Sequence, residues 1–390
     1  MSKQPSVVVT IPYIINENHH HGNITTSIDN DGIFDVPFGN LIYHKVYTTL
    51  QSPNHSIQYK CSALQYLLYY TLQNELHSIE CSEHNELIDT IIQQSIQPSI
   101  DIDLQVSLTN VISHLSHIHS HCTDILINQH IVQQYIIYLQ SYTDMKFNIS
   151  SHSLINIINT IQHCITCNIN RSGIYELSDS ANINILVQLI EYCITKNQYN
   201  VIENLIKCVI SVLRNEKIYK LCIDNNIIQL TKKLMSRVTT QSITYQSVLC
   251  QLITCLSVHQ IGKQQLHECH VVQYMLPLLC TADEHILQSV IHSLMQCTSY
   301  VPCKLLLVNN INTCKQLYML IQQYHTLHTV TLSYLLQTIG NLAESQQFRL
   351  SSEFSTINIH QLIQSISNES NDILLQQCAR RTLDKLQWKP

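Results

Sequence analysis

The stretch T-L-S-Y-L-L-Q-T-I-G-N-L-A-E-S, at positions 331–345, carries the clearest structural pattern in the chain. Its apolar residues recur at the spacing of one face of an α-helix, at Leu332, Leu335, Leu336, Ile339, Leu342 and Ala343. The stretch Q-S-V-L-C-Q-L-I-T-C-L-S, at positions 246–257, has the same wide apolar face, with Leu252 near its middle, and we expect Gly262 to break the helix after it. Helices of this kind are buried by packing against other helices.

The composition favours an all-α protein. Of 390 residues, 45% are hydrophobic and only 12% are charged, about half the usual ~25%. With 6 Gly and 8 Pro, chain breakers are too few for a turn-rich β-sandwich or barrel. The 54 Ile against 5 Ala reveal a bias that runs through the whole chain. A surplus of His or Cys is therefore weak grounds for proposing chemistry.

A short motif recurs along the chain, in which a polar residue precedes an apolar one at the head of what we interpret as the last helix of a unit. It occurs at Leu87, Ile131, Ile183, Ile227, Val271, Ile311 and Ile357, with spacings of 44, 52, 44, 44, 40 and 46 residues. Armadillo and HEAT units have this length, whereas tetratricopeptide and ankyrin units are shorter. The one long interval contains the polar stretch 168–180, which we interpret as an insertion. Because one unit cannot bury its apolar face alone, neighbouring units stack.

The sequence therefore predicts an all-α, armadillo/HEAT-like right-handed superhelical solenoid of about seven repeats. We assign residues 40–390 to the solenoid, with a C-terminal helix that caps it. Residues 1–39 contain Gly22, Gly32 and Gly39 and a run of three His, and we expect a mobile N-terminal arm there.

Two stretches resemble one family among armadillo proteins, the radial spoke head 14 homolog family of ciliary axonemes. The C-terminal Q-C-A-R-R-T-L-D-K-L-Q-W-K-P, at 377–390, is similar to that family's closing helix and its Q-W-K-P end. The opening F-G-N-L-I-Y-H-K-V-Y-T-T-L-Q-S-P-N-H-S-I-Q-Y-K-C-S-A-L-Q-Y-L-L, at 38–68, resembles its first helices in length and register. The resemblance implies a non-catalytic radial spoke component that supports spoke assembly or ciliary motility, with axonemal subunits as partners and a place in the cytoplasm and axoneme.

The alternative hypothesis is a cytosolic armadillo adaptor or cargo receptor that binds peptide segments in its groove. Import receptors of this fold use repeated Trp and Asn on their groove helices, whereas this chain has one Trp, Trp388, near its end. Trp388 could cap the last helix or anchor a partner, and Trp is a favoured residue at interfaces. Localisation of a tagged copy would separate the two hypotheses.

Positive charge is concentrated in one repeat. Residues 1–150 hold 4 basic and 13 acidic residues, whereas residues 196–237 hold 8 basic and 3 acidic ones. We expect the last helix of this unit, with Lys232 and Lys233, to line the concave groove of an armadillo fold. The hypothesis is a docking site for an acidic protein segment, and the alternative is an ordinary solvated surface. The candidate partner-binding residues are Lys207, Arg214, Lys217, Lys220, Lys232, Lys233, Arg237 and Trp388.

Other functions find little support in the sequence. His117 and His121 have a spacing that can hold zinc, but H-E-x-x-H is absent and we predict no metal site. Cys164 and Cys167 form a C-x-x-C within an apolar helix, which favours core packing over redox chemistry. No Gly-rich phosphate loop or nucleophile motif occurs, so we expect no enzyme, cofactor or small-molecule substrate.

The chain as a whole also argues against nucleic-acid and membrane partners. Its net charge is −6, and basic residues are not interleaved with aromatic ones as in nucleic-acid-binding surfaces. No apolar run approaches the length of a membrane span, and we expect no secretion signal. The 16 Cys are scattered singly, which favours the reducing cytosol.

Overall fold

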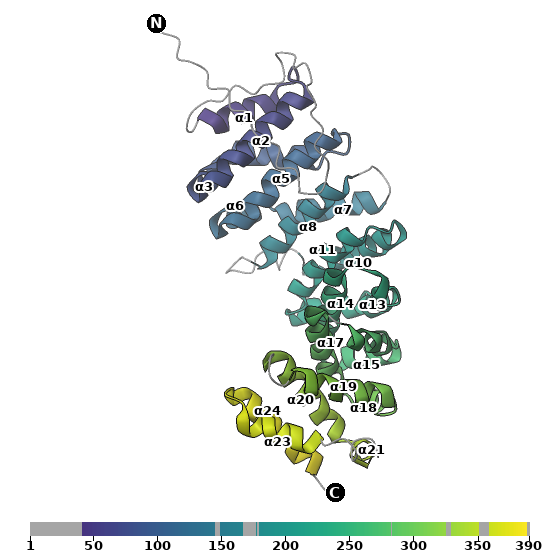
Figure 1. Cartoon of the computed structure of the whole chain (residues 1–390). Helices are drawn as coiled ribbons and strands as arrows, with labels where there is room; N and C mark the ends of the chain where they lie inside the picture. Colours follow the sequence, from purple (N-terminus) through teal and green to yellow (C-terminus); the bar gives the residue numbers. More distant parts are fainter. Residues whose placement is uncertain are drawn as a thin grey trace, which may run out of the picture. The chain divides into compact units, whose positions relative to one another are not determined.

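The computed structural model describes residues 41–144, 149–166, 177, 179–281, 283–324, 329–350 and 359–387. Within these ranges every regular element is a helix, so the predicted all-α fold is confirmed (Figure 1). The chain divides into two compact units, Met1–Glu176 and Leu177–Pro390. This boundary falls inside the stretch 168–180 that we interpreted as an insertion. The predicted N-terminal arm lies outside the described residues.

The first unit is a stack of helices. Its helices are α1 (Leu41–Gln51), α2 (Ile57–Gln73), α3 (Glu75–Glu83), α4 (Asn85–Ser95), α5 (Ile102–Ile118), α6 (Ser120–Asn128), α7 (Ile131–Thr143) and α8 (Ser151–Thr166). From α3 onward a short, a middle and a long helix alternate. The long helices α2, α5 and α8 pack one on the next.

The second unit also has about three helices per repeat, but their lengths vary: the middle helix α10 is longer than α11, and the middle helix α16 is shorter than α15. Its elements are α10 (Ser180–Thr195), α11 (Tyr199–Val212), α12 (Glu216–Asp224), α13 (Ile227–Met235), η1 (Val238–Thr240), α14 (Ile243–Leu256), α15 (Gln260–Glu268), α16 (Val271–Met275), η2 (Leu276–Cys280), α17 (Glu284–Cys297), α18 (Val301–Val308), α19 (Ile311–Tyr324), α20 (Thr329–Ala343), α21 (Gln346–Leu350), α23 (Ile359–Glu369) and α24 (Ile373–Gln387). The helices α11, α14, α17, α20 and α24 form a ladder in which each packs on the next.

The predicted repeat is confirmed by the helix boundaries. Six of the seven motif residues lie at or near the start of a middle helix, at α4, α7, α10, α13, α16 and α19. The seventh, Ile357, lies outside the described residues, and α23 begins two residues after it. The next α-helix after each of them packs in the series of long helices, with a short 3-10 helix in between after α13 and α16.

Hydrogen bonds between neighbouring repeats join residues that lie about one repeat length apart in the sequence. Thr254 and Ser293, on α14 and α17, share one between their hydroxyls at 2.8 Å, over 39 residues. The Thr382 hydroxyl donates to the Leu336 carbonyl at 2.9 Å, over 46 residues. Lateral contacts therefore repeat once per unit, as stacked helical units require.

The predicted core register is also confirmed. All six apolar residues of the 331–345 stretch are buried in α20, and Leu252 in α14 is only 1% exposed. Most described cysteines are buried as well. Burial raises the pKa of Cys250 to about 12, so this thiol packs as a small apolar group.

Gly262 does not break a helix, contrary to our prediction. The preceding helix α14 already ends at Leu256, and Gly262 is buried within α15. A Cβ atom at this position would lie 1.9 Å from the Leu256 carbonyl oxygen and 2.2 Å from the Tyr219 hydroxyl. Gly262 is therefore needed for the close approach of α15 to the end of α14.

In three repeats, a residue in the left-handed conformation lies between the short and the middle helix. His130, Asn226 and His270 have φ of 55°, 62° and 60° and directly precede α7, α13 and α16. Asn and His adopt this conformation more readily than most residues. Each of these turns is two residues long, and the short and middle helices that it joins contact each other.

Candidate protein-binding surface

The predicted basic residues are spread over three helices of the second unit and the segments that join them. Lys207 lies on α11, and Arg214 lies between α11 and α12. Two lysines lie on α12 and two on α13, and Arg237 follows α13. Most of these side chains are exposed, whereas Lys207 and Lys232 are half-buried. Lys207 therefore belongs to the repeat that α11 ends, whereas the lysines of α12 and α13 belong to the next one, so the basic segment spans parts of two repeats.

Three of these lysines already have acidic partners within the chain. The ion pairs are Lys207–Glu203 at 2.7 Å, Lys220–Glu216 at 2.9 Å and Lys233–Glu191 at 2.8 Å. The hydrogen bond and the charge of Lys220 lower the pKa of Glu216. These pairs reduce the positive field of the segment.

Arg237 has a neutral partner. Its guanidinium donates a hydrogen bond to the Tyr199 hydroxyl at 3.3 Å, across 38 residues. Tyr199 in turn packs edge-on against the buried Tyr245. Arg237 is therefore held at the start of α11 by its hydrogen bond to Tyr199.

Arg214, Lys217 and Lys232 form no ion pair with any residue that the structure describes. Arg214 and Lys217 are also exposed. Among the candidate residues, these three and Arg237, whose partner is neutral, keep a positive charge that no described carboxylate balances. Sequence reasoning did not separate them from the paired lysines. Lys207 and Lys220 pair with a Glu four residues earlier, a spacing that the sequence shows, whereas Glu191 lies 42 residues from Lys233.

Lys232 and Lys233 do not lie on the last helix of their repeat, contrary to our prediction. The structure places them on α13, which precedes the longer α14, and the ladder of long helices passes through α14. We expected the helix that begins with the recurring motif to be the last helix of its repeat, whereas the structure shows that it is the middle one. The partner-binding role of these residues stays a prediction.

Trp388 and Cys167 lie outside the described residues. The last described helix, α24, ends at Gln387 and packs against α20 and α23. Whether Trp388 caps the stack or binds a partner therefore stays a prediction. The neighbour of Cys167 in the C-x-x-C motif, Cys164, is buried in α8.

The two histidines with zinc spacing have separate neighbours in the first unit. The ring of His117 stacks on that of His163 at 4.5 Å, whereas His121 lies 3.5 Å from the Glu83 carboxylate. Among the described residues no group of three or more His, Cys, Asp or Glu is arranged to hold a metal ion. Burial, together with the charge of His117, lowers the pKa of His163 to about 4. His163 is therefore a neutral packing residue near pH 7.

No family model matches the chain, and no curated protein matches it. The chain does match solved structures. The designed armadillo repeat protein YIII(Dq)4CqI aligns with a TM-score of 0.52 and 16% identity, over 65% of this chain and 98% of its own. The chain has an armadillo-like fold. A second designed armadillo repeat protein, in complex with the peptide (KR)4, aligns with a TM-score of 0.53 and 16% identity, over 66% of this chain and 99% of its own.

A third similar structure belongs to computationally designed armadillo repeat proteins for modular peptide recognition. It aligns with a TM-score of 0.51 and 15% identity, over 65% of this chain and 99% of its own. At such identities the likeness shows the fold alone. In addition, no described helix is both long and apolar enough to cross a membrane.

Proposed function

We propose that this protein is a non-catalytic scaffold whose repeats bind other proteins. The observation that carries the proposal is the ladder of stacked long helices with its armadillo-like fold, which presents equivalent side chains once per unit. Two similar designed proteins are named for peptide recognition or for a bound peptide. The exposed, unpaired Arg214 and Lys217 favour a partner segment that carries acidic residues.

The more specific proposal is a radial spoke component of the ciliary axoneme that supports spoke assembly or motility, with spoke subunits as partners. The resemblance of residues 38–68 and 377–390 to the radial spoke head 14 homolog family supports it. The alternative is a cytosolic armadillo adaptor or cargo receptor.

Expression of the tagged full chain in ciliated cells tests both levels of the proposal. A spoke component is recovered in the axonemal fraction together with spoke subunits. Recovery in the nucleus or the cytosol alone contradicts the axonemal role. A chain that co-purifies with no protein in any fraction contradicts the scaffold as well.

Charge reversal tests the basic surface. Arg214→Glu with Lys217→Glu should reduce co-purification of an acidic partner, and added salt should have the same effect on the unmodified chain. Arg380→Glu with Arg381→Glu is the matched control, because both residues are exposed and the net charge changes equally. Equal loss with both pairs of substitutions would show that only the overall charge matters.

A further inference from the structure

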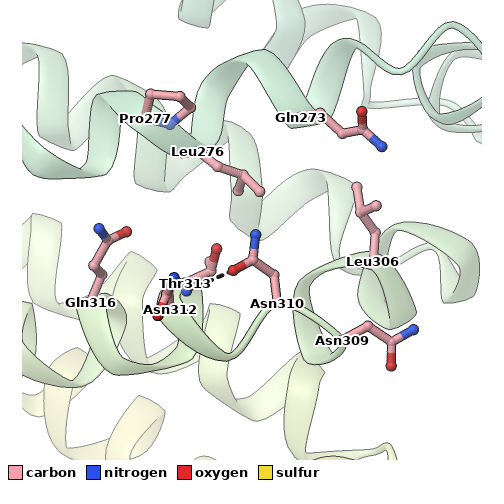
Figure 2. A pocket seen from close by; sticks show the side chains of 9 residues that line it. All are labelled: Gln273, Leu276, Pro277, Leu306, Asn309, Asn310, Asn312, Thr313 and Gln316. Atoms are coloured by element: carbon pink, nitrogen blue, oxygen red, sulfur yellow. Dashed lines mark hydrogen bonds between the residues drawn. The ribbon is translucent and has the colours of Figure 1, made fainter.

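A groove in the second unit is lined by none of the candidate basic residues and by no residue of the ladder of long helices. Figure 2 shows its two walls, which come from α16 and η2 on one side and from the end of α18 and the start of α19 on the other. Its volume is about 920 Å³. This size lies at the upper end of the ~300–1,000 Å³ typical of ligand sites. Successive middle helices therefore leave a space large enough for several residues of another chain.

None of the nine described residues that line the groove carries a charge. Five of its nine lining residues carry carboxamides, namely Gln273, Asn309, Asn310, Asn312 and Gln316. Leu276, Pro277 and Leu306 supply the apolar part. A carboxamide both donates and accepts hydrogen bonds, as a peptide group does.

Several of these carboxamides have hydrogen-bonding capacity to spare. The Asn310 carbonyl oxygen accepts the Thr313 backbone N–H at 3.2 Å, which leaves its NH₂ group directed into the space below Leu276 (Figure 2). Gln273 and Asn312 are exposed, and their side chains make no hydrogen bond to any residue that the structure describes. Donors and acceptors thus face an occupant from both walls.

We propose that this groove binds an extended, uncharged segment of a partner protein. An extended main chain presents unpaired N–H and C=O groups, which the carboxamides match without any charge. An apolar side chain of the segment packs on Leu276 and Leu306. A helix would keep its main-chain groups to itself and would need a wider apolar floor. A phosphate-bearing ligand would find no cation among the residues described as lining the groove.

This inference rests on the proposed scaffold function and names the chemistry of one partner segment. It does not involve the basic residues. The two surfaces can therefore be tested separately in the same full-length protein.

The first experiment selects octapeptides from a capped library of uncharged residues on the immobilised full chain. Selected peptides are labelled with fluorescein and measured by anisotropy. Gln273→Glu with Asn312→Asp places two charges in the groove at unchanged shape, and should weaken binding at least tenfold. Gln323→Glu with Asn371→Asp adds the same charges at exposed positions outside the groove and should change binding less than twofold.

The second experiment uses an exposed thiol beside the groove as a reporter. The Gln316 amide donates to Cys280 Sγ at 2.7 Å, so an occupant of the groove should shield Cys280. Iodoacetamide labelling, resolved by mass spectrometry, should slow at Cys280 at least fivefold with saturating peptide and stay unchanged at Cys378 on α24.

Three results would overturn the proposal. One is that no uncharged peptide is selected, and another is that the groove and control variants bind the peptides equally. The third is self-association in sedimentation experiments that the groove variants abolish, because the occupant would then be a second copy. Loss of axonemal recovery through Arg214→Glu and Lys217→Glu, with peptide binding intact, would leave the groove assignment standing.

Discussion

Two joints between neighbouring repeats of the second unit are built in opposite ways. At the first, α15 lies against the end of α14, and the Tyr219 hydroxyl donates to the Leu256 carbonyl at 2.7 Å. At the second, Glu344 binds Lys304 of α18 and Lys385 of α24 through its two carboxylate oxygens. The first joint depends on the absence of a side chain at Gly262, and the second depends on charge. The first should therefore respond to added volume, and the second to protonation.

The charged joint is partly withdrawn from water. Lys304 is only 5% exposed, whereas Lys385 and Glu344 are much more accessible. Burial by itself would raise the pKa of Glu344. The hydrogen bonds and the charges of Lys304 and Lys385 outweigh it, so that the pKa lies below its ordinary value.

The largest effect is expected at the close joint. Gly262→Ala should destabilise the second unit by about 4 kcal/mol or more, because the added methyl group meets a backbone carbonyl that cannot move away. Urea unfolding of the full chain, with hydrogen exchange in α12, α14 and α15, measures it.

Gly340→Ala provides the control. A Cβ atom there lies 3.2 Å from Thr382 Oγ1, a distance that a small shift relieves. Its effect should stay within about 1 kcal/mol, since Ala also favours a helix over Gly. Equal effects at both glycines would contradict the distinction between the two positions.

The core of α14, beside the close joint, should give the next effect. Leu252→Ala removes a side chain that is 1% exposed and should cost about 2–5 kcal/mol. The exposed Ile243, on the same helix, is the control, and Ile243→Ala should cost less than about 0.5 kcal/mol. Equal midpoints in urea for the two variants would show that the core register is wrong.

The core was predictable from the sequence because its signal is local. Leu252 and the residues of 331–345 follow the 3.6-residue period of a helix face, and the motif at Ile227 or Val271 repeats with the length of the unit. The helix-face pattern is set by neighbours within one or two turns, and the motif is a short local pattern whose recurrence can be counted along the chain. The structure confirms both.

What the sequence did not reveal depends on residues about 40 positions apart. Gly262 reads as a helix breaker unless Tyr219 and Leu256 are known to lie beside it. Lys233 reads as a free cation until α10 brings Glu191 within 2.8 Å. The carboxamide groove joins α16 and η2 to α18 and α19, and its Asn and Gln were indistinguishable from the general bias of the chain.

The charged joint should show an intermediate effect. Glu344→Gln leaves Lys304 buried without an anionic partner and should destabilise the second unit by about 1–2 kcal/mol, less than a fully buried pair would lose because Glu344 is itself partly exposed. Lys385→Gln should cost less, because Lys385 is more exposed and Lys304 keeps its partner. The reverse ranking in urea unfolding would mean that Lys304 does not depend on the ion pair.

Lowering the pH should remove the stabilisation that the ionised Glu344 provides. Because the pKa of Glu344 is lower in the folded chain than its ordinary value of 4.5, its contribution is complete above about pH 4.5 and is lost as the pH falls through the folded value. The stability difference between the unmodified chain and Glu344→Gln should therefore shrink between pH 5 and pH 3. Gly262→Ala should show no such dependence, since no charge takes part in the close joint. A constant Glu344→Gln difference over this range would contradict the assignment.

The smallest effect on the free energy of unfolding is expected at the turn that follows α15. Its sign is opposite, because the substitution there should stabilise the protein. His270 is exposed and holds φ at 60° between α15 and α16. A left-handed conformation costs a non-Gly residue about 1–2 kcal/mol, whereas Gly adds about 0.5–1 kcal/mol of backbone entropy to the unfolded chain. His270→Gly should therefore stabilise the second unit by up to about 1 kcal/mol, and His270→Asn by less. If His270→Gly lowered the urea midpoint, the imidazole itself would be stabilising this turn, and the close joint would extend beyond Gly262 to the turn between α15 and α16.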